Sequence, residues 1–174
     1  MKKIIARKNI NLRLVELSDV DFILFLRTDS RKNLFLNQTS NDKNKQIEWL
    51  LSYKDRENKG EEFYFMIESK NKEEMGLVRL YDFRKSSFCW GSFLIKSGAP
   101  FYISIETVLF VYDFAFYELN FKESHFDVRK ENEHVVRFHK NFGARIIDED
   151  KYNFYFNMTL ENYEKIKQKY KKFL

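Results

Sequence analysis

The sequence predicts an α/β fold of the α+β type, with helices flanking a central mixed sheet of about seven strands that is mostly antiparallel. Three observations lead to this prediction. Apolar runs of strand length alternate with stretches of helical spacing along the chain. In two places neighbouring runs are separated only by a short polar turn, which is typical of antiparallel hairpins. Two strand–helix–strand passages supply the right-handed crossovers that parallel pairing requires.

The composition indicates one folded domain spanning residues 1–174. Hydrophobic residues make up 44% of the chain and aromatic residues 18%, which excludes a disordered protein. The one cysteine, Cys89, rules out an internal disulfide and points to a reducing compartment. No apolar run approaches the roughly 20 residues that cross a bilayer, and residues 1–6 are too short in their apolar part for a secretory signal. We therefore expect a cytoplasmic protein without a membrane span.

The formal charge of +5 does not point to nucleic acid, because of how it is distributed. Basic and acidic residues are interleaved almost everywhere, except in the basic stretch 165–172. Proteins that bind nucleic acid usually concentrate their positive charge on one stripe. We therefore expect no nucleic-acid partner.

The first third of the chain predicts one strand and two helices. A short alternating strand covers residues 11–15. Ser18 is the predicted N-cap of the first helix, with Asp21 three positions later in a weak capping box. The polar span 31–45 lacks a clear period and is predicted to be mostly loop. Helical spacing returns over residues 46–53, which predicts the second helix.

The middle of the chain predicts three consecutive strands and then a long helix. Residues 62–68 and 76–83 form a hairpin around a polar turn, and residues 88–95 are a nearly continuous apolar run. A break with the only proline, Pro100, follows, and apolar residues then recur at helical spacing over residues 105–119. A helix N-terminus after such a break offers unpaired N–H groups and a positive dipole end, which suit a phosphate.

The last third predicts a further strand over residues 124–128 and a helix over residues 132–142. A closing hairpin follows, with strands at 143–147 and 152–158 around an acidic turn. Apolar residues on one face of 161–174 predict a final amphipathic helix. The sequence shows no internal repeat and no boundary between domains.

Three segments carry family motifs: Asn-Leu-Arg-Leu-Val-Glu-Leu-Ser-Asp at 11–19, Gly-Leu-Val-Arg-Leu-Tyr-Asp-Phe at 76–83, and Asn-Glu-His-Val-Val-Arg-Phe-His-Lys-Asn-Phe-Gly-Ala at 132–144. With the element order, they resemble the GNAT superfamily of acetyl-CoA-dependent N-acetyltransferases from about residue 11 to residue 158. The last segment is the most specific match, since the family has Asn, a small residue three positions on, an aromatic pair, and Gly-Phe opening the next strand. The resemblance implies a GNAT-like fold and acetyl-CoA as the cosubstrate.

The resemblance also implies where acetyl-CoA binds. The oxyanion donor is expected to be a backbone N–H on a splayed strand, among Phe93, Leu94 and Ile95, and Gly91 predicts a bulge or a close approach there. The family's pyrophosphate loop reads Arg/Gln-x-x-Gly-x-Gly/Ala, and this chain departs from it with Ala99, Tyr102 and Ser104. Backbone N–H groups can bind phosphate without glycine, so we still expect contacts in this loop, from Ile103, Ser104 and Ile105.

Two residues of the 132–144 segment are expected to act on acetyl-CoA. His139 aligns with the family tyrosine that usually protonates the leaving thiolate, a role that imidazole suits if a neighbour keeps it protonated. The alternative is a semi-buried core histidine. Asn132 aligns with a residue that binds the pantetheine arm, or it is simply the N-cap of its helix.

The candidates for the general base are Asp82 and Glu106. The alternative for Asp82 is an aspartate in the turn before Arg84. The alternative for Glu106 is an acid near the helix N-terminus that the helix dipole favours. Arg79, Tyr81 and Trp90 are candidates for a cationic and aromatic wall that binds the substrate, although strand aromatics are also typical of a core. Cys89 is expected to be a buried thiol.

No metal is predicted, because His125 and His134 have no metal-binding spacing with acids or cysteine. The function that the resemblance favours is acetylation of a small-molecule amine. The run 88–95 with Glu106 and Phe138-His is most similar to bacterial enzymes that acetylate amino sugars carried on nucleotides, in the synthesis of surface polysaccharide or glycan precursors. Two alternatives stay open: an enzyme for protein or peptide amines, and a GNAT-like binding module that has lost acetyl-CoA. A homodimer is compatible with either enzyme.

Overall fold

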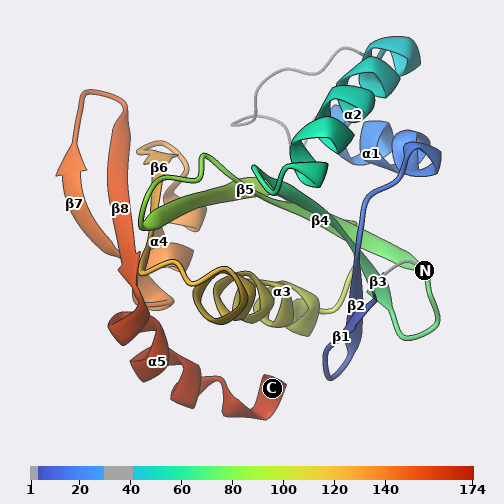
Figure 1. Ribbon diagram of the computed structural model, residues 1–174. Coiled ribbons are helices and arrows are strands. Elements are labelled where there is room, and N and C mark those ends of the chain that lie inside the picture. Colours follow the sequence, from blue (N-terminus) through green and yellow to red (C-terminus); the bar gives the residue numbers. More distant parts are fainter. Residues whose placement is uncertain (1–3, 30–40) are drawn as a thin grey trace.

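The computed structural model describes residues 4–29 and 41–174, and all of the following refers to them. Their strands form one eight-stranded sheet in the order β1-β2-β3-β4-β5-β6-β8-β7 (Figure 1). The strands are β1 Ile5–Ala6, β2 Ile10–Leu14, β3 Phe63–Ser69, β4 Glu74–Tyr81, β5 Ser87–Ile95, β6 Glu123–Arg129, β7 Arg145–Glu149 and β8 Asn153–Thr159. Of the described pairs, only β5 with β6 is parallel. The mixed, mostly antiparallel sheet is therefore confirmed. The strand that was not predicted is the two-residue β1, which is too short to show a period.

The helices lie on both faces of the sheet (Figure 1). They are α1 Val20–Thr28, α2 Lys43–Asn58, α3 Phe101–Asp113, α4 Glu133–Asn141 and α5 Leu160–Lys169, with short turns at η1 Leu17–Asp19, η2 Phe114–Glu118 and η3 Lys171–Phe173. The side chain of Asp42 accepts hydrogen bonds from the backbone at the start of α2. This helix therefore begins earlier than predicted. The rest of the predicted loop 31–45 lies mainly outside the described residues.

The two hydrophobic cores lie on opposite faces of the sheet, one under α1 and α2 and the other around α3. The alternation of β3 shows this division, because Tyr64 and Met66 belong to the core under α1 and α2, whereas Phe65 and Ile67 belong to the core around α3. Helix α3 is buried along most of its length, and Val108, Leu109 and Val111 are fully covered. The prediction of a long buried helix after the 88–95 strand is therefore confirmed.

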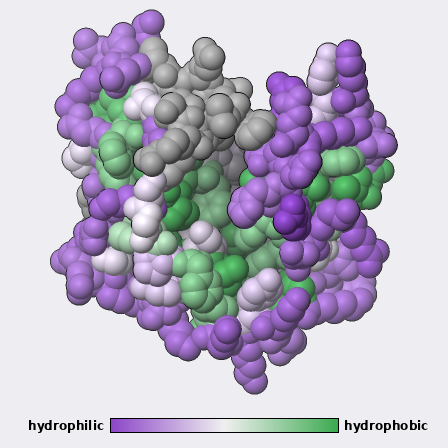
Figure 2. Space-filling view, turned by 180° about the vertical axis from the view of Figure 1, so that it is seen from behind, coloured by the Kyte–Doolittle hydropathy of each residue, from purple (hydrophilic) through white to green (hydrophobic). Residues whose placement is uncertain are grey.

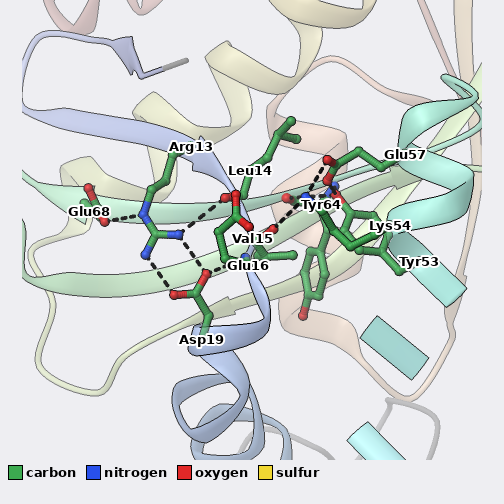
Figure 3. A network of polar contacts seen from close by, with 10 residues as sticks. All are labelled: Arg13, Leu14, Val15, Glu16, Asp19, Tyr53, Lys54, Glu57, Tyr64 and Glu68. Atoms are coloured by element: carbon green, nitrogen blue, oxygen red, sulfur yellow. Dashed lines mark hydrogen bonds and ion pairs between the residues drawn. The ribbon is translucent and has the colours of Figure 1, made fainter. Parts of the chain in front are cut away.

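A buried ion-pair network fixes the start of α1 against the sheet (Figure 3). The Arg13 guanidinium donates to both carboxylate oxygens of Asp19, at 2.7 and 2.9 Å, and to Glu68 at 2.6 Å. Asp19 also accepts a hydrogen bond from the Glu16 backbone, so it forms the capping box of η1. Ser18 was predicted as the N-cap, and this was wrong. The cap forms at Asp19 because its carboxylate accepts hydrogen bonds from both the Glu16 backbone and the Arg13 guanidinium.

Candidate active site

The sheet opens between its two parallel strands. β5 and β6 pair only where Ser87 faces Glu123 and Phe88 faces Ser124, although both strands continue beyond these residues. From there β5 stays with β4, whereas β6 stays with β8 (Figure 1). Figure 2 shows a hollow with a hydrophobic floor between the part of the molecule carrying α1 and α2 and the part carrying β7 and β8. A ligand that enters between β5 and β6 meets backbone groups that have no strand partner on that side.

A bulge in β5 marks the point of divergence. Arg79 pairs with Gly91 and Leu77 pairs with Leu94, so β5 contains one more residue than β4 over this stretch. Ser92 takes up the irregularity with φ of 46°. A Cβ atom on Gly91 would lie 3.0 Å from the hydroxyl of Tyr81, which leaves little room for a side chain. The bulge and the close approach predicted at Gly91 are both confirmed.

The three predicted oxyanion donors differ in their surroundings. Leu94 and Ile95 lie opposite Leu77 and Gly76 in the ladder with β4. Phe93 directly follows the bulge, where the added residue changes the direction of the backbone groups. The role of these N–H groups stays a prediction, and Phe93 is the candidate that this geometry favours.

Helix α3 begins without a side-chain cap. Its N-cap residue is Pro100, and the first N–H to bond within the turn is that of Ile103, which donates to the Pro100 carbonyl at 3.1 Å. The N–H groups of Phe101 and Tyr102 precede the helical ladder, and such groups favour an anion. The predicted set Ile103, Ser104 and Ile105 therefore begins too far into the helix. The N–H groups that fit a pyrophosphate better begin two residues earlier, at residues 101 and 102.

His139 lies between the two diverging strands. Its ring centroid is 5.4 Å from that of Trp90 in β5 and 4.4 Å from that of Phe126 in β6. The side chain is 8% exposed, and burial lowers its pKa to about 4. The proposed proton donor needed a neighbour that keeps it protonated, and none of the described acids contributes to this pKa. At neutral pH His139 is therefore an uncharged hydrogen-bond donor, and its role in the reaction stays a prediction.

Asn132 is the N-cap of α4, as the alternative interpretation expected. Its side-chain oxygen accepts from the Val135 N–H, at a long distance of 3.5 Å. The cap uses the oxygen, so the side-chain amide group of Asn132 is left to donate elsewhere. A contact with the pantetheine arm stays a prediction.

The surroundings of Glu106 argue against a general base. Its carboxylate is fully buried and accepts hydrogen bonds from the backbone N–H of Asn9 at 2.9 Å and from the Asn9 side chain at 2.5 Å. These bonds join α3 to the turn between β1 and β2. A base must reach the amine of the acceptor, whereas Glu106 is enclosed and its oxygens are already used. The prediction for Glu106 is therefore corrected to a structural role.

Asp82 lies at the closed end of the opening. Its carboxylate contacts Arg84 at 2.7 Å and His125 at 2.9 Å, and the other ring nitrogen of His125 contacts Ser87 at 2.8 Å. The hydrogen bond with His125, followed by that from Arg84, lowers the pKa of Asp82. A lowered pKa makes a carboxylate a poorer base. The alternative of a turn aspartate suits Asp82 better, since these contacts join the β4–β5 turn to β6.

The three predicted substrate-binding residues do not share a face. Arg79 and Tyr81 pair with Gly91 and Cys89 on the α1 and α2 side, and the Arg79 guanidinium lies 4.8 Å from the Tyr81 ring. Trp90 lies on the other face, where its indole N–H donates to the Tyr112 hydroxyl at 3.2 Å. Trp90 is therefore separated from the other two, because successive side chains of a strand point to opposite faces.

Two residues of this region were not singled out from the sequence. Trp49 of α2 lies 5.0 Å from the Arg79 guanidinium, which also lies 4.8 Å from the Tyr81 ring. No sequence signal indicated this contact, because it joins a helix to a strand 30 residues away (79 − 49). Asp127 of β6 is exposed on the face opposite to that of the buried Phe126, and strand alternation could have revealed this.

Two searches of the described residues found nothing further. No helix there is long and apolar enough to cross a membrane. No group of three His, Cys, Asp or Glu side chains in that part of the chain is placed to hold a metal ion.

The chain matches known proteins in sequence and in structure. The family model described as an acetyltransferase (GNAT) domain matches residues 9–145. Among solved structures, "Apo FdhC, a nucleotide-linked sugar GNAT" is 38% identical, covers 100% of this chain and 99% of its own, and has a TM-score of 0.90. A search of curated proteins found no significant match.

More distant structures share the fold. The spermidine N-acetyltransferase from Vibrio cholerae, in complex with CoA and spermine, is 20% identical and covers 90% of this chain and 98% of its own, with a TM-score of 0.74. The ribosomal-protein-S5-alanine acetyltransferase from Vibrio fischeri is 16% identical and covers 92% of this chain and 98% of its own, with a TM-score of 0.77. At such identities the similarity extends to the fold alone.

Proposed function

The chain belongs to the GNAT family of acetyltransferases, and on this basis we propose that it transfers an acetyl group from acetyl-CoA to the amine of a nucleotide-linked amino sugar. That it is an N-acetyltransferase follows from the family, and the acceptor is the proposed part. One observation carries the proposal: the similarity to a nucleotide-linked sugar GNAT extends over the full length of both chains at 38% identity. The polyamine and ribosomal-protein enzymes are 20% and 16% identical.

The opening between β5 and β6 would hold acetyl-CoA at several points. The N–H groups of Phe101 and Tyr102 would hold the pyrophosphate at the uncapped start of α3. The free amide group of Asn132 would orient the pantetheine arm. Acetyl-CoA supplies the activated acyl group, and the N–H of Phe93 would stabilise the negative charge on its carbonyl oxygen as the amine attacks. The neutral His139 ring, between Trp90 of β5 and Phe126 of β6, would donate a hydrogen bond to the departing sulfur.

The acceptor would approach from the α1 and α2 face. There the Arg79 guanidinium lies 5.0 Å from the ring of Trp49 and 4.8 Å from the ring of Tyr81. Glu62 forms an ion pair with one of its nitrogens, and its Nε is buried without a partner among the described residues. A planar guanidinium fixed in this way suits a phosphate, and the flanking rings suit a base or a sugar. The diphosphate of a nucleotide sugar would therefore bind beside Arg79.

A panel of amines tests the acceptor. CoA release from acetyl-CoA would be followed with uridine- and thymidine-diphosphate-linked amino sugars, spermidine, and a peptide that begins with alanine. We expect a kcat/KM for at least one nucleotide sugar that exceeds those for spermidine and the peptide by roughly 100-fold, or about 3 kcal/mol of transition-state binding. A preference for spermidine or the peptide would contradict the proposal.

Binding of acetyl-CoA is measured first, without an acceptor. At 100 times its Kd, acetyl-CoA should stabilise the folded protein by about 3 kcal/mol and so raise its Tm. A folded protein whose Tm does not change at millimolar acetyl-CoA would instead support the alternative of a binding module. The cytoplasmic location and the homodimer expected from the sequence are retained in this proposal, and size-exclusion chromatography with light scattering tests the dimer.

A further inference from the structure

Asp127 lies on β6 at the level where β5 turns away. In the paired part of the two strands Ser87 faces Glu123 and Phe88 faces Ser124, an offset of 36 residues in both pairs (123 − 87 and 124 − 88). The same offset places Asp127 opposite Gly91 (127 − 36), at the bulge. β5 and β6 no longer form backbone hydrogen bonds at this level, so the space between them is lined by side chains. Asp127 therefore stands across the opening from the proposed acetyl site.

Strand alternation points Asp127 toward the acceptor side. Its neighbours Phe126 and Val128 are buried in the core around α3, whereas Asp127 is exposed on the other face. The thiol of Cys89 lies across the opening on this face, and burial and then the charge of Asp127 raise its pKa to about 11. The same charge adds to the raised pKa of the Tyr81 hydroxyl, of which burial is again the main cause. Both couplings agree with the direction that strand alternation gives the carboxylate, toward β4 and β5.

The carboxylate is also without a bound partner. Nothing in the described parts of the chain donates a hydrogen bond to it or forms an ion pair with it. Its neighbours on this face are engaged elsewhere: His125 with Asp82 and Ser87, Arg129 with the Tyr152 ring at 5.8 Å, and Tyr155, opposite Asp127 on β8, with Asp150. Asp82, Asp113 and Asp150, in contrast, are all paired. Asp127 thus has the free oxygens that the predicted bases lack.

We propose that Asp127 is the catalytic residue that binds the ammonium group of the acceptor and takes the proton that its nitrogen loses. The proposal rests on acetyl transfer as the reaction. Loss of one proton from the bound ammonium group to solvent frees the nitrogen lone pair, which forms the C–N bond. The electron pair of the C–S bond leaves with sulfur, and the resulting thiolate takes a proton from solvent. The second proton that nitrogen loses passes to a carboxylate oxygen of Asp127 and then to solvent. Nitrogen becomes far more acidic once it is bonded to the acyl carbon, so a carboxylate suffices as the acceptor.

Asp127→Asn tests the proposal, because it keeps the size of the side chain and removes its charge and basicity. The matched control is Asp148→Asn, which removes an exposed carboxylate from β7, beyond β8. The amine used is whichever primary amine the wild type acetylates in the panel above. We expect Asp127→Asn to lower kcat/KM for that amine by roughly 100-fold to 10,000-fold at pH 7, and the loss to shrink as the pH rises and frees the amine. Asp148→Asn should stay within about threefold of the wild type.

Hydroxylamine separates this role from a structural one, because its nitrogen is already unprotonated at pH 7. With Asp127→Asn, kcat/KM for hydroxylamine should fall by less than about tenfold, provided that the Tm of the variant is unchanged. Two results would overturn the role of Asp127. One is an equal loss of kcat/KM by Asp127→Asn for the primary amine and for hydroxylamine. The other is a kcat/KM of Asp127→Asn for the primary amine within about threefold of the wild type. If the wild type acetylates spermidine or the peptide but no nucleotide sugar, the proposed acceptor is wrong, and the Asp127 test proceeds with the amine that reacts.

Discussion

The burial of His139 without a charged partner has a measurable consequence for stability in acid. Burial lowers its pKa to about 4 in the folded protein, against an ordinary value near 6.5 in the unfolded chain. Between these values the unfolded chain binds a proton that the folded protein excludes, so stability is complete above about pH 6.5 and falls as the pH falls. The linkage amounts to about 2 kcal/mol at pH 5 and about 3 kcal/mol at pH 4.

His139→Phe removes the titrating group and keeps a ring among Trp90, Phe126 and Phe156. The assay is urea unfolding of both proteins at pH 7.5 and pH 5. Any cost of repacking around the new ring is the same at both pH values, so it cancels when the unfolding free energy at pH 5 is subtracted from that at pH 7.5. Between pH 7.5 and pH 5 the wild type should lose about 2 kcal/mol more than the variant. His134→Phe, at an exposed position of the same helix, is the control and should behave like the wild type. Equal losses in wild type and His139→Phe would refute the neutral, buried state.

Four further predictions follow from the same contacts. His139→Phe should lower kcat roughly tenfold, the worth of one hydrogen bond to sulfur, with KM for acetyl-CoA unchanged in steady-state kinetics. Arg79→Ala should raise KM for a nucleotide sugar roughly 10- to 100-fold, whereas Trp90→Phe, on the other face, should leave that KM within about twofold. Gly76→Ala should destabilise the fold by about 1–3 kcal/mol in urea unfolding, because the new Cβ would lie 2.5 Å from the Leu94 carbonyl oxygen. Arg13→Met should cost about 3–5 kcal/mol in the same assay, because it leaves Asp19 and Glu68 buried without a cation.

The order of the elements was predictable from the sequence because it depends on local periods. The 62–68 and 76–83 hairpin, the 88–95 strand and the helix after Pro100 all occur close to their predicted positions. The bulge next to Gly91 was predictable, because a glycine in a strand interior often marks a bulge or a close approach. These features depend on residues that are near one another in the chain.

The faces of the site were harder to predict, since they depend on register. Trp90 pairs with Leu80, whereas Arg79 pairs with Gly91, so Trp90 is one position along β5 from the residue opposite Arg79 and points to the other face. Trp90 was grouped with Arg79 and Tyr81 because no local pattern shows this register. Glu106 was misassigned for a related reason: its partner Asn9 is 97 residues away, and no local pattern shows which side of α3 it covers.

The glycine-poor loop can be understood from the way α3 begins. Tyr102 and Ser104 replace the family glycines, but both lie inside the helix, where an ordinary side chain fits without strain. The N–H groups before the helical ladder belong to Phe101 and Tyr102, and no side-chain cap competes for them. Lys96, just before this loop, is a candidate to replace the missing basic residue, because its ion pair with the exposed Glu73 costs little to exchange for a phosphate. We therefore expect pyrophosphate binding at this helix to depend on the break at Pro100 and on the uncapped N–H groups after it more than on glycine.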